Sequence, residues 1–289
     1  MSRIAYVNGR YVQQAEASVH IEDRGYQLAD GIYEVVYVNG GRLIDEALHL
    51  DRMERSLREI RVRVPMDRGA LQHVLRQVLR RNRVRDGLLY MQVTRGVAPR
   101  EHAFPAAPIA PSIVVTVRRL PAFPRDAAAN AGSAITYPDE RWARCDIKST
   151  ALLPNVLARQ AAKERGAVEA ILIDRDGMVT EGAATSVWAV AAGDVLRTRA
   201  LGPTILPGCT RAALIGLMRD AGIAFEERAV SEAELREANE VFLTSASSFV
   251  KPVTRVDGTT IGDGTVGPVT RKLFDLFARH ANGSLRNAA

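Results

Sequence analysis

The amino-acid sequence predicts an α+β protein with two domains. Runs rich in β-branched and aromatic residues are mixed with amphipathic helical segments, without the strict alternation that marks a doubly wound sheet. Residues 120–126, with prolines at 121 and 124, interrupt the pattern, and strands and helices then start again. We therefore expect one domain at residues 1–120 and another at 121–289, each large enough to bury a core without disulfides or metals.

The first domain opens with short strands and continues with two helices. Strand-like runs cover residues 4–7, 32–38, 88–94 and 112–117, and Asn8-Gly9 is a hairpin signal. Helical spacing of Leu48, Met53, Leu57 and Ile60 predicts a helix over residues 43–60. A second helix is predicted to start at residues 65–67, with one apolar face made of Leu71, Val74, Leu75, Val78 and Leu79.

A long loop separates the last two strands of this domain. Residues 96–111 hold four prolines and the charged sequence Arg100-Glu101-His102. Loops of this length in compact domains are often functional.

The second domain repeats the mixture of strands and helices. Helices are predicted over residues 149–165, 210–220 and 269–280. Strands are predicted at 170–173, around Val179, and at 186–190 and 240–244, with a tight turn at 174–177.

Charge and composition narrow the function classes. The chain is 47% hydrophobic and 25% charged, as in ordinary globular proteins. The net charge of +6 would suit a nucleic-acid partner, but the arginines are spread among acids and apolar residues and form no long basic run. A solvated arginine-rich surface is favoured. A nucleic-acid-binding protein is kept as the alternative of a different class, recognisable by steeply salt-dependent binding.

The cysteines and the hydropathy pattern point to the cytoplasm. Two cysteines, Cys145 and Cys209, do not make a disulfide framework. The N-terminus lacks the apolar run of a signal peptide, and no segment reaches the roughly 20 apolar residues that cross a bilayer.

Lysine is scarce, with only Lys148, Lys163, Lys251 and Lys272 among the 289 residues. A lysine can form a Schiff base with a carbonyl compound, which arginine cannot do. Lys148 lies where a strand-like segment meets the predicted helix at 149, and the nearby Arg141 and Arg144 would oppose its protonation.

Three further segments have the composition of binding sites. Glu181 stands between a β-rich run and the small residues 182–184, which permit close approach of a ligand. Residues 206–211 precede a helix, whose N-terminus favours anions. Residues 244–248 are small and hydroxyl-rich. Taken singly, each segment also fits an ordinary turn or helix cap.

Together and in this order, these segments resemble the fold type IV pyridoxal-phosphate enzymes (aminotransferase class IV), and within them the D-amino acid aminotransferases. The most specific stretches are Arg-Cys-Asp-Ile-Lys-Ser at 144–149 and Val-Thr-Glu-Gly at 179–182. The resemblance implies an N-terminal α/β sandwich and a C-terminal pseudo-barrel domain. It also implies pyridoxal 5′-phosphate as cofactor, bound as a Schiff base to Lys148.

The resemblance assigns the remaining roles residue by residue. Lys148 would also shuttle a proton, and Glu181 would keep the pyridine nitrogen protonated, which makes the ring an electron sink. The implied cofactor-binding residues are Lys148, Glu181, Arg52, Cys209, Thr210, Ala246 and Ser247. Ala246 departs from the family pattern, which has a threonine there.

Three residues define the substrate class that the resemblance implies. Tyr33, Arg100 and His102 match the residues that bind the substrate α-carboxylate in D-amino acid aminotransferases. An arginine fork binds a carboxylate bidentately, and tyrosine and histidine add donors. The implied donors are D-alanine, D-glutamate and D-aspartate, with 2-oxo acids as acceptors. The implied assembly is a homodimer.

Two enzymes of the same fold remain open as alternatives: a branched-chain L-amino acid aminotransferase and an aminodeoxychorismate lyase. The Arg-x-His pair argues against the first. Phe249, where relatives often have glutamate, and Pro154 also depart from the family pattern and put the side-chain preference in doubt.

Overall fold

The computed structural model describes residues 3–121, 123 and 126–283. Packing groups residues 3–121 and 147–151 into one compact unit and the other described residues into a second. The predicted boundary after residue 120 stays a prediction about separate domains, and part of the linker expected at 120–126 lies outside the described residues.

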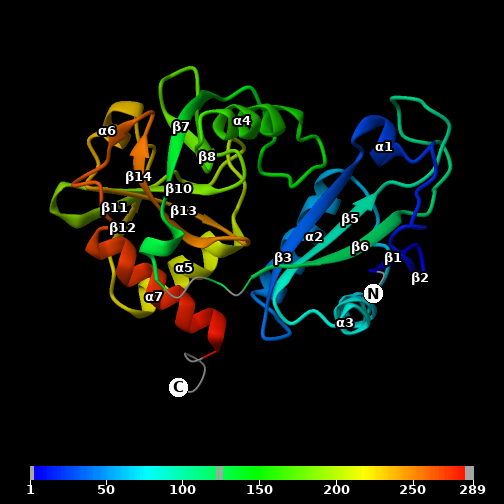
Figure 1. Cartoon of the computed structure of the whole chain (residues 1–289). Helices are drawn as coiled ribbons and strands as arrows, with labels where there is room; N and C mark the ends of the chain where they lie inside the picture. The colour runs from blue at the N-terminus through cyan, green and yellow to red at the C-terminus, as the bar shows by residue number, and fades with distance from the viewer. Residues whose placement is uncertain (1–2, 122, 124–125, 284–289) are drawn as a thin grey trace. The chain divides into compact units, whose positions relative to one another are not determined.

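An antiparallel sheet of six strands forms the first unit (Figure 1). Its order is β2-β1-β6-β5-β3-β4, and all neighbours are antiparallel. The hairpin at Asn8-Gly9 is confirmed, with both residues at positive φ, as a tight two-residue turn requires. The strands are β1 (Ile4–Val7), β2 (Arg10–Gln13), β3 (Gly31–Asn39), β4 (Arg42–Leu43), β5 (Gly87–Thr94) and β6 (Ser112–Arg119).

Two helices supply the apolar layer that packs on this sheet, α2 (Glu46–Glu59) and α3 (Arg68–Asn82). The apolar face predicted for α3 is buried, and Asp67 caps the helix by accepting from the Ala70 N–H. The expectation for α2 was partly wrong. The helix begins at Glu46 rather than residue 43, and Leu50 is buried in place of Leu48. A short helix, α1 (Arg24–Leu28), precedes β3.

A curled mixed sheet forms the second unit. The path of the sheet runs β12-β11-β10-β13-β14-β7-β8-β9, and β15 pairs with β14. The edge strand β9 is joined to the interior strand β10 by residues 183–185 alone, so the sheet must curl. This half-barrel confirms the expected pseudo-barrel. The strands are β7 (Gly132–Pro138), β8 (Glu169–Ile173), β9 (Val179–Gly182), β10 (Ser186–Ala191), β11 (Val195–Thr198), β12 (Phe225–Glu227), β13 (Glu240–Ser245), β14 (Phe249–Val256) and β15 (Thr259–Thr260).

Helices surround this curled sheet, with α4 against β7 and β8, and α5 and α7 beside each other near β13 (Figure 1). The helix expected from residue 149 begins only at Leu153, with Pro154 in its first turn, where proline is favoured. The helical elements are α4 (Leu153–Glu164), α5 (Cys209–Asp220), α6 (Glu232–Arg236) and α7 (Pro268–Asn282), with 3₁₀ turns η1 (Ala128–Asn130) and η2 (Ala192–Asp194). None of the helices within the described residues has the length and hydropathy of a transmembrane span.

Candidate active site

Lys148 belongs to a short segment of the first unit that bridges to β3. Its carbonyl accepts from the Tyr33 N–H at 3.0 Å, and the Thr150 N–H donates to the Gly31 carbonyl at 3.0 Å. Ile147 is buried in the core of this unit. The expected strand–helix junction at Lys148 is therefore wrong. The Lys148 carbonyl and the Thr150 N–H are bonded to β3, an arrangement that a helix would break, so the helix starts only beyond them.

The side chain of Lys148 lies against Tyr33, so two of the predicted site residues come together. The Lys148 Nζ is 4.2 Å from the centroid of the Tyr33 ring, within the range of a cation–π contact. The Tyr33 ring stacks on Tyr90 at 5.8 Å between centroids. Burial, with a smaller effect of Tyr33, raises the pKa of Tyr90 to about 12. The lysine amine thus lies over one ring of a stacked aromatic pair.

Arg52 forms a buried ion pair on the opposite face of β3. Its Nε and Nη2 donate to the Glu34 carboxylate at 2.8 and 2.7 Å, and His49 Nδ1 lies 2.8 Å from the same carboxylate. Burial alone would raise the pKa of Glu34, but Arg52 outweighs it and lowers the pKa to about 2. The phosphate-binding role of Arg52 stays a prediction. The structure shows that Glu34 fixes the orientation of its guanidinium.

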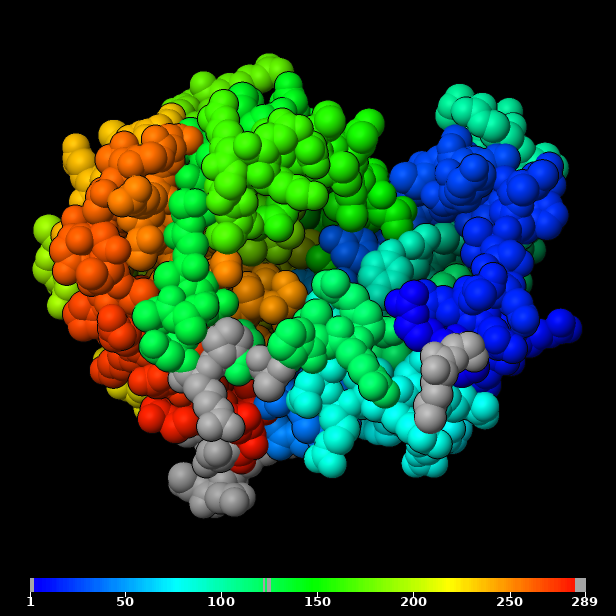
Figure 2. Space-filling model, viewed as in Figure 1, coloured from blue at the N-terminus to red at the C-terminus, as the bar shows by residue number. Residues whose placement is uncertain are grey.

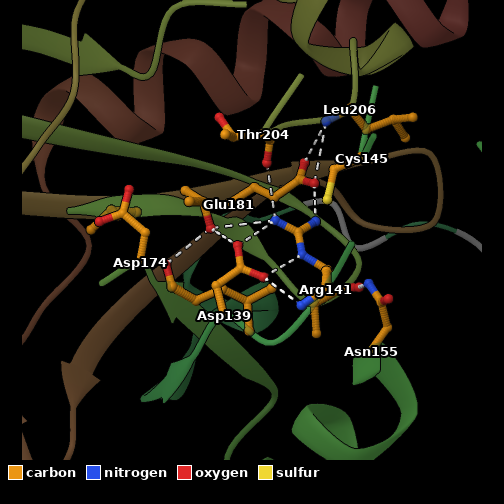
Figure 3. A network of polar contacts seen from close by, with 12 residues as sticks. Asp139, Arg141, Cys145, Asn155, Asp174, Glu181, Thr204 and Leu206 are labelled. Carbon is orange, nitrogen blue, oxygen red and sulfur yellow. Dashed lines mark hydrogen bonds and ion pairs between the residues drawn. The ribbon is translucent and has the colours of Figure 1, made fainter. Parts of the chain in front are cut away.

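Glu181 lies in a polar network of the second unit (Figure 3). Its carboxylate accepts a short hydrogen bond from Arg141 Nη1 and bonds from the Leu206 N–H at 3.2 and 3.1 Å. Arg141 also donates to Asp139, by Nε at 2.9 Å and by Nη2 at 2.8 Å. The Thr180 hydroxyl donates to Asp139 at 2.6 Å.

The charges in this network do not cancel. Two carboxylates, Asp139 and Glu181, face one guanidinium, so the three side chains carry one net negative charge. Burial opposes ionisation of Asp139, but hydrogen bonding and charge from Arg141 outweigh it and lower its pKa. Burial raises the pKa of Cys145 to about 11. Arg141 acts in the opposite direction, but the two carboxylates add to the effect of burial. The cluster is suited to a buried cationic group.

Arg141 and Arg144 were expected to oppose protonation of Lys148 through like charge. In the structure both arginines are ion-paired, Arg141 as above and Arg144 with Asp146 at 2.9 Å. Their charges are therefore compensated locally, and the effect on Lys148 stays a prediction without direct support.

The two predicted phosphate-binding segments also lie in the second unit. The N-cap of α5 is Gly208, which offers no capping side chain, so Cys209 and Thr210 open a helix whose first-turn N–H groups suit an anion. Ala246 and Ser247 lie in the turn between β13 and β14. There the Ser245 hydroxyl is 3.2 Å from that of Ser247 and 2.8 Å from that of Ser248.

Arg100 and His102 lie in the exposed loop between β5 and β6. Figure 2 shows this loop in teal, projecting beside the blue segment that contains α1. No hydrogen bond of the Arg100 or His102 side chain is described within the first unit. Their carboxylate-binding role stays a prediction.

Sequence reasoning missed two carboxylates that orient arginines of the candidate site. Asp139 orients Arg141, and Glu34 orients Arg52. One signal was available for Glu34, because a carboxylate inside the apolar strand Ile32–Val38 needs a buried partner. Asp139 gave no such signal.

Comparisons with known proteins agree with this architecture. The family profile of amino-transferase class IV matches residues 31–256. The D-alanine aminotransferase of Bacillus licheniformis is 43% identical over 266 residues, covering 92% of this chain and 93% of the relative. The D-alanine aminotransferase of Staphylococcus haemolyticus is 40% identical over 275 residues, covering 95% and 96%.

A solved structure shares the fold at lower identity. The branched-chain amino acid aminotransferase of T.th., solved with pyridoxamine 5′-phosphate, superposes with a TM-score of 0.88. It is 24% identical, and the match covers 98% of this chain and 95% of that one.

Proposed function

Because this chain belongs to the class IV aminotransferases, we propose that it transfers amino groups from D-amino acids to 2-oxo acids. The donors are D-alanine, D-glutamate and D-aspartate, and the acceptors are 2-oxoglutarate or pyruvate. The observation that carries this choice is the full-length similarity to D-alanine aminotransferases at 43% and 40% identity. The branched-chain enzyme is similar at only 24%, which supports the fold alone.

Members of this family use pyridoxal 5′-phosphate, and the residues present fit that group. The net negative charge shared by Asp139, Arg141 and Glu181 suits a protonated ring nitrogen. The N-terminus of α5, capped by a glycine, suits a phosphate. When bound, the cofactor supplies an electron sink for the electron pair left at the substrate Cα.

The chain's own residues then divide the work. Lys148 would hold the cofactor through Nζ and would move the proton of the substrate Cα. Glu181, which accepts a hydrogen bond from Arg141, would hold the proton on the ring nitrogen. The phosphate is bound by Arg52, Cys209, Thr210, Ala246 and Ser247. The substrate carboxylate is bound by Tyr33, Arg100 and His102, whose fixed donors admit one enantiomer.

We further infer a homodimer in the cytoplasm. The dimer is the family expectation, and gel filtration with light scattering tests it. Neither Cys145 nor Cys209 is in a disulfide, which supports a reducing compartment.

An absorbance scan and a coupled assay test the function together. The purified protein should show a band near ~410–420 nm that D-alanine bleaches and L-alanine and L-leucine do not. D-alanine with 2-oxoglutarate should yield pyruvate, measured with lactate dehydrogenase. Lys148→Ala should abolish the band and the activity, and Lys163→Ala, an exposed lysine on α4, is the matched control.

The other outcomes identify the alternatives. Bleaching by L-leucine would indicate a branched-chain aminotransferase. Pyruvate formed from aminodeoxychorismate without any amino acceptor would indicate the lyase. No band after incubation with pyridoxal phosphate would refute a cofactor role for Lys148.

A further inference from the structure

A buried arginine of the first unit reaches from α1 into the exposed loop that carries Arg100 and His102. Arg24 is only 2% exposed. Its Nε donates to Asp30 at 2.8 Å, while Nη1 donates to the carbonyl of Glu101 at 2.5 Å and Nη2 lies 3.4 Å from the carbonyl of His102. One guanidinium therefore connects the interior of the unit to two successive carbonyls at the tip of the loop.

The peptide between Glu101 and His102 is fixed at both of its polar ends. Arg24 binds its carbonyl. The Glu101 carboxylate accepts from its N–H, that of His102, at 2.7 Å and from the Ala103 N–H at 3.4 Å. These backbone N–H groups also lower the pKa of Glu101, so its carboxylate stays ionised at neutral pH. Because a peptide is planar, fixing both ends sets the plane that joins Glu101 to His102, the second of the two peptides between Arg100 and His102.

From this geometry we propose that Arg24 is a positioning residue for substrate recognition. By holding the peptide that joins Glu101 to His102, it limits the relative orientations that Arg100 and His102 can take as a binding pair for the α-carboxylate. The inference rests on the proposed function, since it takes these two residues as the carboxylate-binding pair. Arg24 acts through them and does not itself contact the substrate.

The base of the loop is tied to the same segment. The Arg24 N–H donates to the Gly96 carbonyl at 2.9 Å, and the Ala98 N–H donates to the Glu22 carbonyl at 3.3 Å. Asp23 and Val97 form an antiparallel bridge between these bonds. The main chain thus fixes where the loop starts, and the Arg24 side chain fixes how its tip is turned.

Removal of Arg24 should leave the fold intact, which makes the proposal testable. Asp30 keeps a bidentate pair with Arg95, at 2.7 and 3.0 Å, so no buried carboxylate loses all its charge partners. The carbonyls of Glu101 and His102 belong to exposed residues and can be hydrated. The main consequence of Arg24→Met is a loop tip that is free to turn.

The experiment compares four variants of the holoenzyme. Arg24→Met removes the three contacts, and Arg24→Lys keeps the charge without the fork. Arg100→Met removes the proposed carboxylate ligand. Arg119→Met is the matched control, because Arg119 Nη2 also donates to two backbone carbonyls, those of Asn82 and Arg83 at 3.2 Å, at the opposite end of β6.

For Arg24→Met we expect the KM for D-alanine to rise about 10- to 100-fold while kcat changes little. Carboxylate binding helps the ground state and the transition state alike, so its loss appears in KM. The rate with L-alanine relative to D-alanine should rise, and the visible band should be unchanged. Trypsin should cleave after Arg100 faster than in the parent protein. The KM of Arg24→Lys should lie between those of the parent and Arg24→Met, and the KM of Arg119→Met should match that of the parent.

The outcomes separate the inference from the proposed function. If the parent protein makes no pyruvate from D-alanine, the proposed function fails. If the parent is active and Arg100→Met raises KM while Arg24→Met behaves like Arg119→Met, the positioning role is overturned. Loss of the visible band and of kcat together in Arg24→Met would also overturn it, because that pattern reports a general structural defect.

Discussion

Replacing Arg141 with methionine would leave two buried carboxylates facing each other. The guanidinium is the cation that contacts both Asp139 and Glu181, and all three side chains are largely buried. Removing one partner of a buried ion pair costs about 3–5 kcal/mol. At about 2–4 °C per kcal/mol for a chain of this size class, we expect Tm to fall by roughly 10 °C.

The stability that Arg141→Met loses should become smaller as the pH falls. In the parent protein the pKa of Asp139 is lowered, so its contribution to stability is present above the unfolded value and is lost as the pH falls through the folded value. Without Arg141, burial dominates and the pKa of Asp139 rises. As the pH falls, protonation first relieves the variant, and the parent loses its own contribution only at lower pH, so the two stability curves converge.

Urea unfolding of the cofactor-free proteins, followed by tryptophan fluorescence, measures this difference. Trp188 is fully buried in the second unit and reports on its unfolding. Arg144→Met is the control from the same segment, because the Arg144 side chain is 43% exposed, so solvent screens its pair with the buried Asp146 and a smaller loss of about 1 kcal/mol is expected. The reasoning is refuted if Arg141→Met is no less stable than Arg144→Met, or if its deficit is the same at pH 7 and pH 4.

Three other changes test separate parts of the structure. Glu34→Gln should lower the free energy of unfolding by about 3 kcal/mol at pH 7, because the pKa of Glu34, about 2, reflects its pairing with Arg52. In urea unfolding this loss should vanish near pH 2, and a loss that does not depend on pH would contradict the reasoning. Phe249→Ala should lower the free energy of unfolding by about 3–5 kcal/mol in the same assay, because the ring packs between Phe123 and Phe277. A loss under about 1 kcal/mol, as for a surface substitution, would contradict this. Gly96→Ala should speed tryptic cleavage of the loop between β5 and β6 and raise the KM for D-alanine. The reason is that φ at Gly96 is 110° and an added Cβ would lie 2.0 Å from the Ala110 oxygen. An unchanged rate of proteolysis would count against this.

Local sequence signals predicted the elements that are fixed locally. The start of α3 follows from the cap at Asp67 and the apolar spacing from Leu71 onward. The start of α4 was misplaced because Ser149 and Thr150 are compatible with a helix but pair with β3, far away in sequence. The strand β14 was missed because it contains Lys251 and Pro252, which are unusual in an interior strand.

The site shows the same division between motif and context. The motifs identified Lys148 and Tyr33, which the structure brings together. They could not reveal Arg24, because its role depends on a side chain that crosses to a distant loop. Phe249 stands at a position where glutamate was expected, and its ring lies in the core against Phe277 rather than in a polar pocket.

The segment 147–151 has a consequence for the order in which the protein is made. It completes the packing of the first unit, to which Ile147 contributes a buried side chain, yet it is translated after residues 126–146 of the second. Domains usually fold as units while the chain emerges from the ribosome. Here the N-terminal unit must wait for residue 151, so a nascent chain that stalls near residue 120 would present an unfinished surface to chaperones.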